Sequence, residues 1–307
     1  MEIFRSFEEA SGIRNPVVTT GSFDGVHIGH KTILRRLKML ADKYEGESVL
    51  ITFDPHPRKV LYPESSGKNL KLINSQQEKL ELLRGAGLDN VIIVQFTRDF
   101  ARTTSEEFVR NYLHGILRAK VVVAGFNHHF GFNQEGDYRK LWEMQSKYNF
   151  EAEEIPEQEV QNETVSSTKI RQAISEGFIQ KANAYLDHYY IVMGLPEKYE
   201  YRNNFYEINL ARVPLTEECK LLPARGLYAV TLKRGKMSSK GMAVINGDNG
   251  GPDEILVNVL DGDPLCYGQD TTIFFHKKIH GSVNLSDQSD SARRLMAARK
   301  EISELIF

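Results

Sequence analysis

Short apolar runs alternate with helical patterns through the first half of the chain. These runs are rich in β-branched residues and carry no charged side chains. Continuous apolar runs of this length predict strands that are buried on both faces of a parallel sheet. The predicted strands are residues 17–20, 49–53, 91–96 and 121–125.

Between these runs, apolar residues recur at the spacing of a helical face, at positions 33, 34, 37 and 40 and again at 80, 82 and 83. A third pattern includes Phe108, Tyr112 and Leu113 and follows Thr104 and Glu107, which are spaced as a capping box. Repeated strand and helix predict a right-handed, Rossmann-like doubly wound α/β fold. Its ligand crevice is expected at the carboxyl ends of the strands.

After about residue 190 the pattern changes to β-patterned runs separated by turn-like clusters, at residues 205–213, 227–233, 241–246, 255–260 and 271–277. This pattern predicts a small antiparallel β-barrel. Residues 289–305 then repeat apolar positions at helical spacing, which predicts a C-terminal helix packed on the barrel. We therefore expect two domains, residues 1–188 and 189–307.

Composition narrows the class of protein. The 39 Lys and Arg residues nearly balance the 41 Asp and Glu residues, so no broad positive surface for nucleic acid is expected. Cys219 and Cys266 lie far apart and lack metal-ligand spacing. The first residues do not resemble a signal peptide and no apolar run spans a bilayer, so we expect a soluble, cytoplasmic protein without a membrane partner. Its oligomeric state is left open.

The densest chemical motif is GSFDGVHIGH, residues 21–30, where the first predicted strand passes into the first helix. Glycines permit tight turns, and the free N–H groups of a helix start favour phosphate. His27 and His30 are three residues apart, so both can face the same polyphosphate. A glycine-rich turn with two surface histidines is the simpler alternative, but the whole string resembles the HxGH nucleotidylyltransferases. Zinc is not expected, because no further ligands stand at suitable spacing.

The second motif is VSSTKIRQAI, residues 165–174. Its hydroxyl residues can cap a helix, and capping alone is the simpler interpretation. Lys169 and Arg171 nevertheless oppose the helix dipole in the first turn, which indicates a compensating anion. We interpret this segment as a phosphate clamp.

Together these motifs resemble the FMN adenylyltransferase module of bacterial bifunctional riboflavin kinase/FAD synthetases. The resemblance covers nearly all of the first predicted domain. It includes ITFDPHPRKVL, FTRDFARTTSEEF and VVVAGFNHHFGFNQEGD, in the order and spacing of that family.

The resemblance implies site residues one by one. On the ATP side they are Gly21, Ser22, Phe23, Asp24, His27, Gly29 and His30, and those that close on the phosphates are Ser166, Ser167, Thr168 and Arg171. Beside the flavin phosphate they are Asp54, His56 and Pro57, and on the flavin side Asn127, Phe130 and Gly131. Asn127 replaces an aspartate of many relatives, which leaves hydrogen bonding but no charged metal ligand.

The implied reaction is transfer of AMP from ATP to the phosphate of FMN, which gives FAD and pyrophosphate. Mg²⁺, His27, His30, Lys169 and Arg171 are the groups expected to stabilise charge at the phosphates. ATP and FMN are the expected small-molecule partners.

In the second half, LLPARGLYAV, GMAVINGD and the pair Tyr267 and Gly268 resemble the riboflavin kinase module. The chain departs from that module at its phosphate motif. The PTAN motif of that family aligns with Tyr206, Glu207, Ile208 and Asn209, of which only Asn209 is kept, and the catalytic glutamate aligns near Leu256. Leucine cannot accept a proton. We expect the kinase chemistry to be lost, although a register shift would place Glu254 on the same side of the strand.

Three alternatives stay open at this point. The first is a fully bifunctional enzyme, and the second is a flavin or nucleotide sensor without catalysis. The third is an adenylyltransferase with another acceptor, such as a nicotinamide or pantetheine phosphate. The intact histidine and SSTKIR motifs disfavour the sensor.

Overall fold

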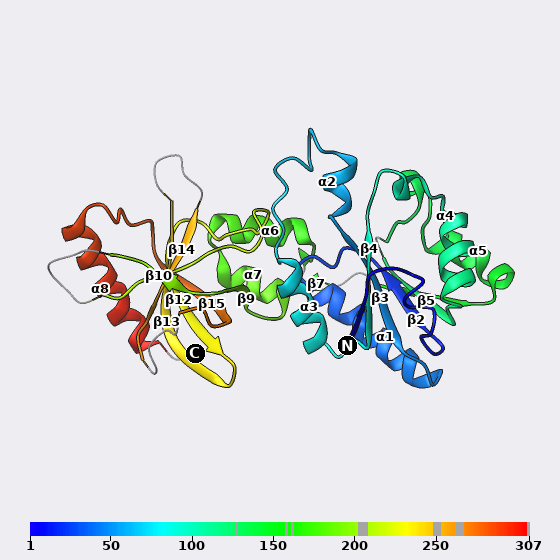
Figure 1. Cartoon of the computed structure of the whole chain (residues 1–307), viewed down its shortest axis with the longest axis horizontal. Helices are drawn as coiled ribbons and strands as arrows, with labels where there is room; N and C mark the ends of the chain where they lie inside the picture. Colours follow the sequence, from blue (N-terminus) through cyan, green and yellow to red (C-terminus); the bar gives the residue numbers. More distant parts are fainter. Residues whose placement is uncertain are drawn as a thin grey trace. The chain divides into compact units, whose positions relative to one another are not determined.

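Two sheets of different kinds organise the chain, one parallel and one antiparallel (Figure 1). The computed structural model describes residues 1–126, 128–156, 159–160, 163–201, 208–247, 253–261 and 267–305, with only the backbone at 159, 160 and 163. Contacts within the chain divide it into unit 1, which is Met1–Leu70 with Lys79–Val165, and unit 2, which is Lys71–Glu78 with Ser166–Phe307. The sequence boundary at residue 188 differs from this division, and the assignment of functions to the two predicted domains stays a prediction.

The sheet of unit 1 is parallel throughout, in the order β1-β4-β3-β2-β5-β6. Its strands are β1 (Glu2–Phe4), β2 (Val17–Thr20), β3 (Ser48–Asp54), β4 (Asn90–Gln95), β5 (Val121–Gly125) and β6 (Glu151–Ile155). The predicted Rossmann-like fold is confirmed. The chain runs from β2 outward to β4 on one side and to β6 on the other, so the order reverses between β2 and β5.

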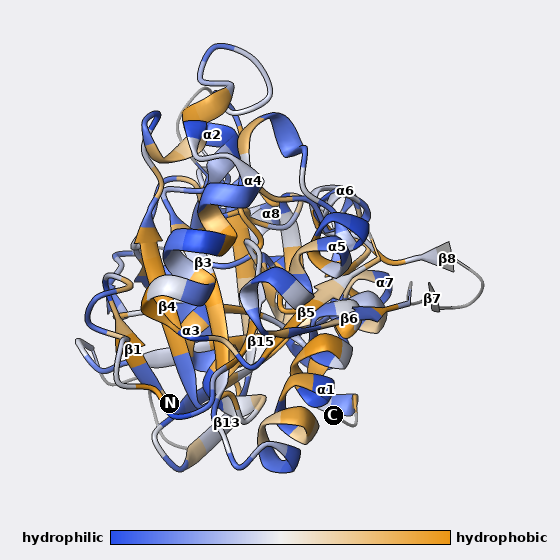
Figure 2. Ribbon diagram, turned by 90° about the vertical axis from the view of Figure 1, so that its right-hand side faces the viewer, coloured by the Kyte–Doolittle hydropathy of each residue, from blue (hydrophilic) through white to orange (hydrophobic). Residues whose placement is uncertain are grey.

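Helices cover both faces of this sheet. On one face lie α1 (Ile28–Lys43) and α3 (Gln76–Gly85), and on the other lie the π-helix η2 (Phe108–Ile116) and α5 (Tyr138–Tyr148). The short elements α2 (Pro57–Leu61), η1 (Phe100–Arg102), α4 (Ser105–Glu107) and η3 (Phe132–Gln134) stand in the connections, and a hairpin follows, β7 (Glu159–Val160) with β8 (Glu163–Thr164). Successive strand residues face opposite sides. Leu50 packs with Leu37 of α1, whereas Ile51 packs with Leu113 of η2. Figure 2 shows β3 and β4 mostly hydrophobic and α1 two-sided.

Unit 2 begins its main segment with α6 (Ser167–Glu176) and α7 (Ile179–Leu186) and continues into a curled antiparallel sheet. The sheet order is β10-β11-β14-β13-β12-β15-β9. Its strands are β9 (Tyr190–Gly194), β10 (Glu197–Lys198), β11 (Ala211–Val213), β12 (Gly226–Arg234), β13 (Met237–Asn246), β14 (Glu254–Val259) and β15 (Thr271–His280). The predicted barrel-like sheet is confirmed.

The terminal helix α8 (Gln288–Glu304) packs on this sheet, as predicted. Leu295, Ala298 and Ile302 are fully buried and share one apolar cluster with Leu227 and Leu256. The predicted strand at 205–213 is shorter in the structure, where it covers only Ala211–Val213, and residues 205–207 lie outside the described part of the chain. Among the described residues, no helix combines the length and apolarity that a membrane crossing requires.

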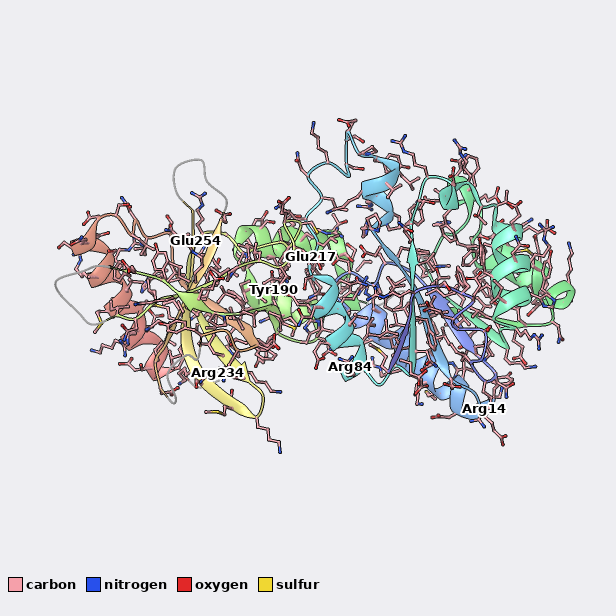
Figure 3. All side chains as sticks on the ribbon, viewed as in Figure 1. Arg14, Arg84, Tyr190, Glu217, Arg234 and Glu254 are labelled. Atoms are coloured by element: carbon pink, nitrogen blue, oxygen red, sulfur yellow. The ribbon has the colours of Figure 1, made fainter. Side chains whose placement is uncertain are left out.

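A buried ion pair holds the segment Lys71–Glu78 within unit 2. The side chains of Lys220 and Glu78 are 2% and 1% exposed, and Nζ of Lys220 lies 2.5 Å from Oε2 of Glu78. The same Nζ donates to the carbonyls of Ile73 at 2.6 Å and Ile191 at 2.8 Å. It also lies 4.4 Å from the ring centre of Tyr190, which is labelled in Figure 3. The charge of Lys220 is therefore engaged by groups that hold unit 2 together.

Candidate active site

The turn between β2 and α1 is tight and strained. Phe23 has φ 49° and Val26 has φ 41°, both in the left-handed region that disfavours bulky and β-branched residues. The side chains of Phe23 and Val26 are 2% and 0% exposed. The amide of Gly21 donates to the carbonyl of Ile51 at 3.0 Å, which fixes the start of the turn on β3. Strain of this kind persists only where the surrounding structure enforces it, and it is common at functional sites.

The turn delivers two histidines to the N-terminal end of α1. His27 is the N-cap residue, and His30 lies in the first turn of the helix. Their rings stack with centres 3.7 Å apart and planes 19° apart. The ring of Phe23 also stacks on His30, with centres 4.3 Å apart. The expected pairing of the two histidines is thus present within unit 1.

His30 is held neutral by its surroundings. Burial, then the neighbouring His27, then the ammonium of Lys79 hold the pKa of His30 well below its ordinary value of 6.5. Nδ1 of His30 is buried and has no hydrogen-bond partner among the described residues. A neutral imidazole with an unused polar atom can donate to, or accept from, a group on a bound ligand.

Two glycines leave room for these rings. A Cβ atom at Gly29 would lie 3.3 Å from two atoms of the His27 ring, and one at Gly21 would lie 3.2 Å from the Phe23 ring. Gly25 has φ 90°, so it supplies the backbone conformation that the turn needs. Of the three glycines expected in the turn, two are thus explained by space and one by conformation.

The segment after β3 lies at the same carboxyl edge of the sheet. Asp54 ends the strand with an exposed side chain. His56 is the N-cap of α2, where its Nδ1 accepts from the amide of Arg58 at 3.2 Å, and Pro57 is the first helical residue. Phe53 contacts the ring of Phe96 at 5.4 Å, which joins this segment to the one after β4. Capping explains His56 locally, and its role toward a flavin phosphate stays a prediction.

The segment after β5 also reaches the histidine turn. Asn127 lies outside the described residues, so its predicted role is not addressed by the structure. Its neighbour His128 hydrogen-bonds the backbone of Thr20 at the end of β2, and burial lowers the pKa of His128 to about 4. The ring of His128 stacks on Phe130, which is buried. This segment therefore closes the edge where the strand order reverses, which is where α/β folds bind ligands.

The SSTKIR segment forms the start of α6 in unit 2. Ser166 is the N-cap, and its hydroxyl accepts from the amide of Lys169 at 3.4 Å. Ser167 and Thr168 occupy the first turn with Lys169, and Arg171 follows. The predicted helix start is confirmed. The histidine turn belongs to unit 1 and this clamp to unit 2, so their joint action on one triphosphate stays a prediction.

Unit 2 holds a polar cavity of about 450 Å³, lined in part by Tyr199, Glu200, Tyr201, Arg225 and Asn246. The position expected for the kinase base is apolar, because Leu256 is fully buried beneath α8. Glu254, labelled in Figure 3, pairs with Arg212 at 2.9 Å. Tyr206 and Glu207 lie outside the described residues, whereas Ile208 is buried.

Two residues that the sequence analysis passed over belong to the histidine site. Lys79 is only 8% exposed, and its Nζ donates to the hydroxyl of Thr52 at 3.2 Å. A signal was available, because Lys79 precedes the buried Leu83 by four residues and so lies on the same face of α3. Among the described residues, no group of three or more His, Cys, Asp or Glu side chains could hold a metal ion.

Known proteins resemble this chain over much of its length. The FAD synthetase family description matches residues 10–169, which are 160 of the 307 residues. The bifunctional riboflavin kinase/FMN adenylyltransferase of Listeria monocytogenes is 32% identical over 270 residues, which cover 86% of this chain and 83% of that protein. The protein of the same name from Escherichia coli K12 is 28% identical over 95% of this chain and 92% of its own length.

Among solved structures, one described as a macrolide-efflux protein from Streptococcus pneumoniae has a TM-score of 0.86 at 24% identity, and 99% of each chain is covered. At that identity the likeness shows the fold alone. The family match spans more than half of the chain, and the L. monocytogenes relative is similar over most of both lengths. The chain therefore belongs to the FAD synthetase family of bifunctional riboflavin kinase/FMN adenylyltransferases.

Proposed function

We propose that this protein is an FMN adenylyltransferase, which transfers AMP from ATP to FMN and releases FAD and pyrophosphate. One observation carries the proposal: the stacked pair His27 and His30 at the N-terminal end of α1, in a chain of this family. Amides at a helix start favour phosphate, and imidazole N–H groups donate to phosphate oxygens.

In this reaction an oxygen of the FMN phosphate bonds to the α-phosphorus of ATP. The bond from that phosphorus to the oxygen bridging the α- and β-phosphates breaks, and pyrophosphate leaves with the electron pair. The FMN phosphate is already an anion at neutral pH, so it needs little help from a base. Catalysis then rests on positioning and on stabilising charge at the phosphates.

We assign the charge-stabilising roles to His27 and His30 in unit 1 and to Lys169 and Arg171 on α6. The planar guanidinium of Arg171 suits paired contacts with phosphate oxygens. The remaining proposed ATP contacts are Gly21, Ser22, Phe23, Asp24, Gly29, Ser166, Ser167 and Thr168. The proposed flavin-side contacts are Asp54, His56, Pro57 and Asn127.

Mg²⁺ belongs to the proposal as the metal that accompanies ATP. Mg²⁺ keeps several waters and takes substrate phosphate oxygens as ligands, so it does not require a ready protein cage. Such a metal–nucleotide complex fits a site where the described residues offer no cluster of three or more His, Cys, Asp or Glu ligands. The ion would neutralise charge on the phosphates that the histidines and α6 contact.

We further propose that unit 2 does not phosphorylate riboflavin. The buried Leu256 at the expected base position supports this, and so does the engagement of Glu254 by Arg212. The relatives are named as bifunctional, so the alternative is a complete enzyme that converts riboflavin to FMN and then to FAD.

Parallel incubations test both proposals. The purified chain is given ATP and Mg²⁺ with either FMN or riboflavin, and the flavins are separated by chromatography. We expect FAD from FMN and no FMN or FAD from riboflavin. Formation of FMN from riboflavin would contradict the loss of kinase activity and favour the bifunctional enzyme. A chain that binds ATP in calorimetry but releases no pyrophosphate with FMN or with another acceptor phosphate would instead be the non-catalytic sensor.

A further inference from the structure

Lys79 is a buried lysine beneath the histidine turn that the reaction as described above does not use. It lies on α3, and its side chain is 8% exposed. A buried ammonium is costly unless hydrogen bonds and nearby charge compensate it, so the groups around Lys79 indicate what it does.

Its hydrogen bonds reach the centre of the phosphate turn. Nζ of Lys79 lies 3.4 Å from the carbonyl oxygen of Ser22 and 3.2 Å from Oγ1 of Thr52. The hydroxyl of Thr52 lies 3.3 Å from the same carbonyl oxygen. Lys79 and Thr52 therefore both hydrogen-bond the peptide group between Ser22 and Phe23.

That peptide group precedes the strained residue of the turn. The carbonyl of Ser22 is bonded to the nitrogen of Phe23, whose φ is 49°. The ring of Phe23 in turn stacks on His30. Holding the Ser22 carbonyl fixes the peptide plane that sets the position of the Phe23 ring, and with it the plane of the His30 imidazole.

The charge of Lys79 adds to this mechanical effect. The N-terminal end of α1 carries a partial positive charge, and a buried ammonium beneath it strengthens the local positive potential. A nucleotide triphosphate is strongly negative, so both the helix end and the ammonium would favour its binding. The same ammonium contributes to the lowered pKa of His30.

We propose that Lys79 is a positioning residue of the adenylyl-transfer site, which holds the Ser22 carbonyl, orients the stacked Phe23 and His30 rings and raises the affinity for the triphosphate. This inference rests on the proposed adenylyltransferase function. It differs from a packing role, because packing alone predicts no change in His30 or in nucleotide affinity when the side-chain volume is kept.

The test replaces Lys79 by Met, which keeps the length of the side chain and removes the charge and both hydrogen bonds. Arg84→Met is the matched control, because Arg84 stands at the last turn of the same helix and is exposed (Figure 3). Three quantities are measured: the dissociation constant of ATP, kcat and KM with FMN, and the pKa of His30 from imidazole NMR signals. Thermal unfolding checks that each variant is folded.

Loss of a charged hydrogen bond predicts that Lys79→Met weakens ATP binding and lowers kcat/KM by about 10- to 100-fold. The pKa of His30 should rise toward its ordinary value, and Arg84→Met should change none of these quantities. Lys79→Arg should recover part of the ATP affinity, because it keeps the charge. It also keeps the test decisive if the Met variant does not fold.

Wild-type ATP affinity together with an unchanged His30 pKa in a folded Lys79→Met variant would overturn the inference. A Lys79→Arg variant that binds ATP no better than Lys79→Met would also overturn it. If Lys79→Met does not fold, a folded Lys79→Ala variant takes its place in this comparison. The His30 titration does not depend on catalysis. A wild-type protein that forms no FAD therefore contradicts the proposed function, whereas equal behaviour of wild type and variant contradicts only the role of Lys79.

Discussion

The two units each bury a lysine, and the partners of the two lysines differ. In unit 2, Lys220 faces a carboxylate and two backbone carbonyls, all within 2.8 Å of its Nζ. In unit 1, Nζ of Lys79 lies 3.4 Å from the carbonyl oxygen of Ser22 and 3.2 Å from Oγ1 of Thr52, and this carbonyl belongs to the turn that carries the histidines. Burial of a lysine therefore does not mark function by itself. The place of its partners does, because Lys220 contacts groups of the unit 2 fold whereas Lys79 contacts the turn that carries the histidines.

The largest expected effect is on the stability of unit 2. Lys220→Met leaves Glu78 buried without its ion-pair partner, which should lower the free energy of unfolding by about 3–5 kcal/mol. Urea unfolding measures this. The double variant Lys220→Met with Glu78→Gln should recover much of the loss, because it removes the isolated charge. A loss below about 1 kcal/mol in the single variant would show that the two lysines are not as different as their contacts indicate.

Next in size is the effect of the histidine pair on catalysis. His30→Ala removes a group proposed to stabilise charge at the phosphates, and kcat/KM for FAD formation should fall by about 10²- to 10³-fold. His114→Ala is the control, since His114 lies on η2, where it contacts the carbonyl oxygen and the ring of Tyr148. Equal activities of the two variants would contradict the proposed role of His30 in the site.

A smaller effect is expected from a methyl group added next to the stacked rings of His27 and His30. Gly29→Ala should leave the stability of α1 unchanged or slightly higher, because Ala favours a helix over Gly by up to about 1 kcal/mol. Its Cβ would press on the His27 ring, and we expect kcat/KM to fall by roughly tenfold. Gly85→Ala on α3 meets nothing within 4 Å and should behave like the wild type. An active Gly29→Ala enzyme would mean that the ring spacing is not critical.

The smallest effect concerns acid stability. The pKa of His128 is about 4 in the folded chain, below the ordinary value of 6.5 expected in the unfolded chain. Between these values the unfolded state binds the extra proton, so the free energy of unfolding falls as the pH drops below 6.5. From pH 7 to pH 5 we expect a loss on the order of 1 kcal/mol from this residue. In His128→Gln, the midpoint of urea unfolding should change less with pH than in the wild type. The same pH dependence in both proteins would contradict the prediction.

The sequence predicted the central strands of unit 1 well, because strands buried on both faces are continuously apolar. Val17–Thr20 and Val121–Gly125 match their predicted ranges. It missed β1 and β6, which lie at the two edges of the sheet. β6 has three glutamates among its five residues and only one buried residue, so it carries no apolar signal.

The candidate site could be predicted only in part. Spacing was enough to bring His27 and His30 together, because residues three apart share a helical face. It did not reveal the left-handed Phe23 and Val26, since those residue types disfavour that conformation. Lys79 stands in a charged stretch typical of a solvent-facing helix, and its four-residue spacing from Leu83 is only a weak signal of burial. Its contacts depend on the packing of α3 against β3.

The most direct test of the central claim is the yield of pyrophosphate per acceptor. The wild-type chain is incubated with ATP, Mg²⁺ and one acceptor, which is FMN, nicotinamide mononucleotide or pantetheine phosphate. The amounts of pyrophosphate and of adenylylated product are measured in the same reaction. The account predicts equal amounts of pyrophosphate and FAD with FMN, and neither product above background with the other acceptors. Pyrophosphate released with another acceptor and not with FMN would contradict it.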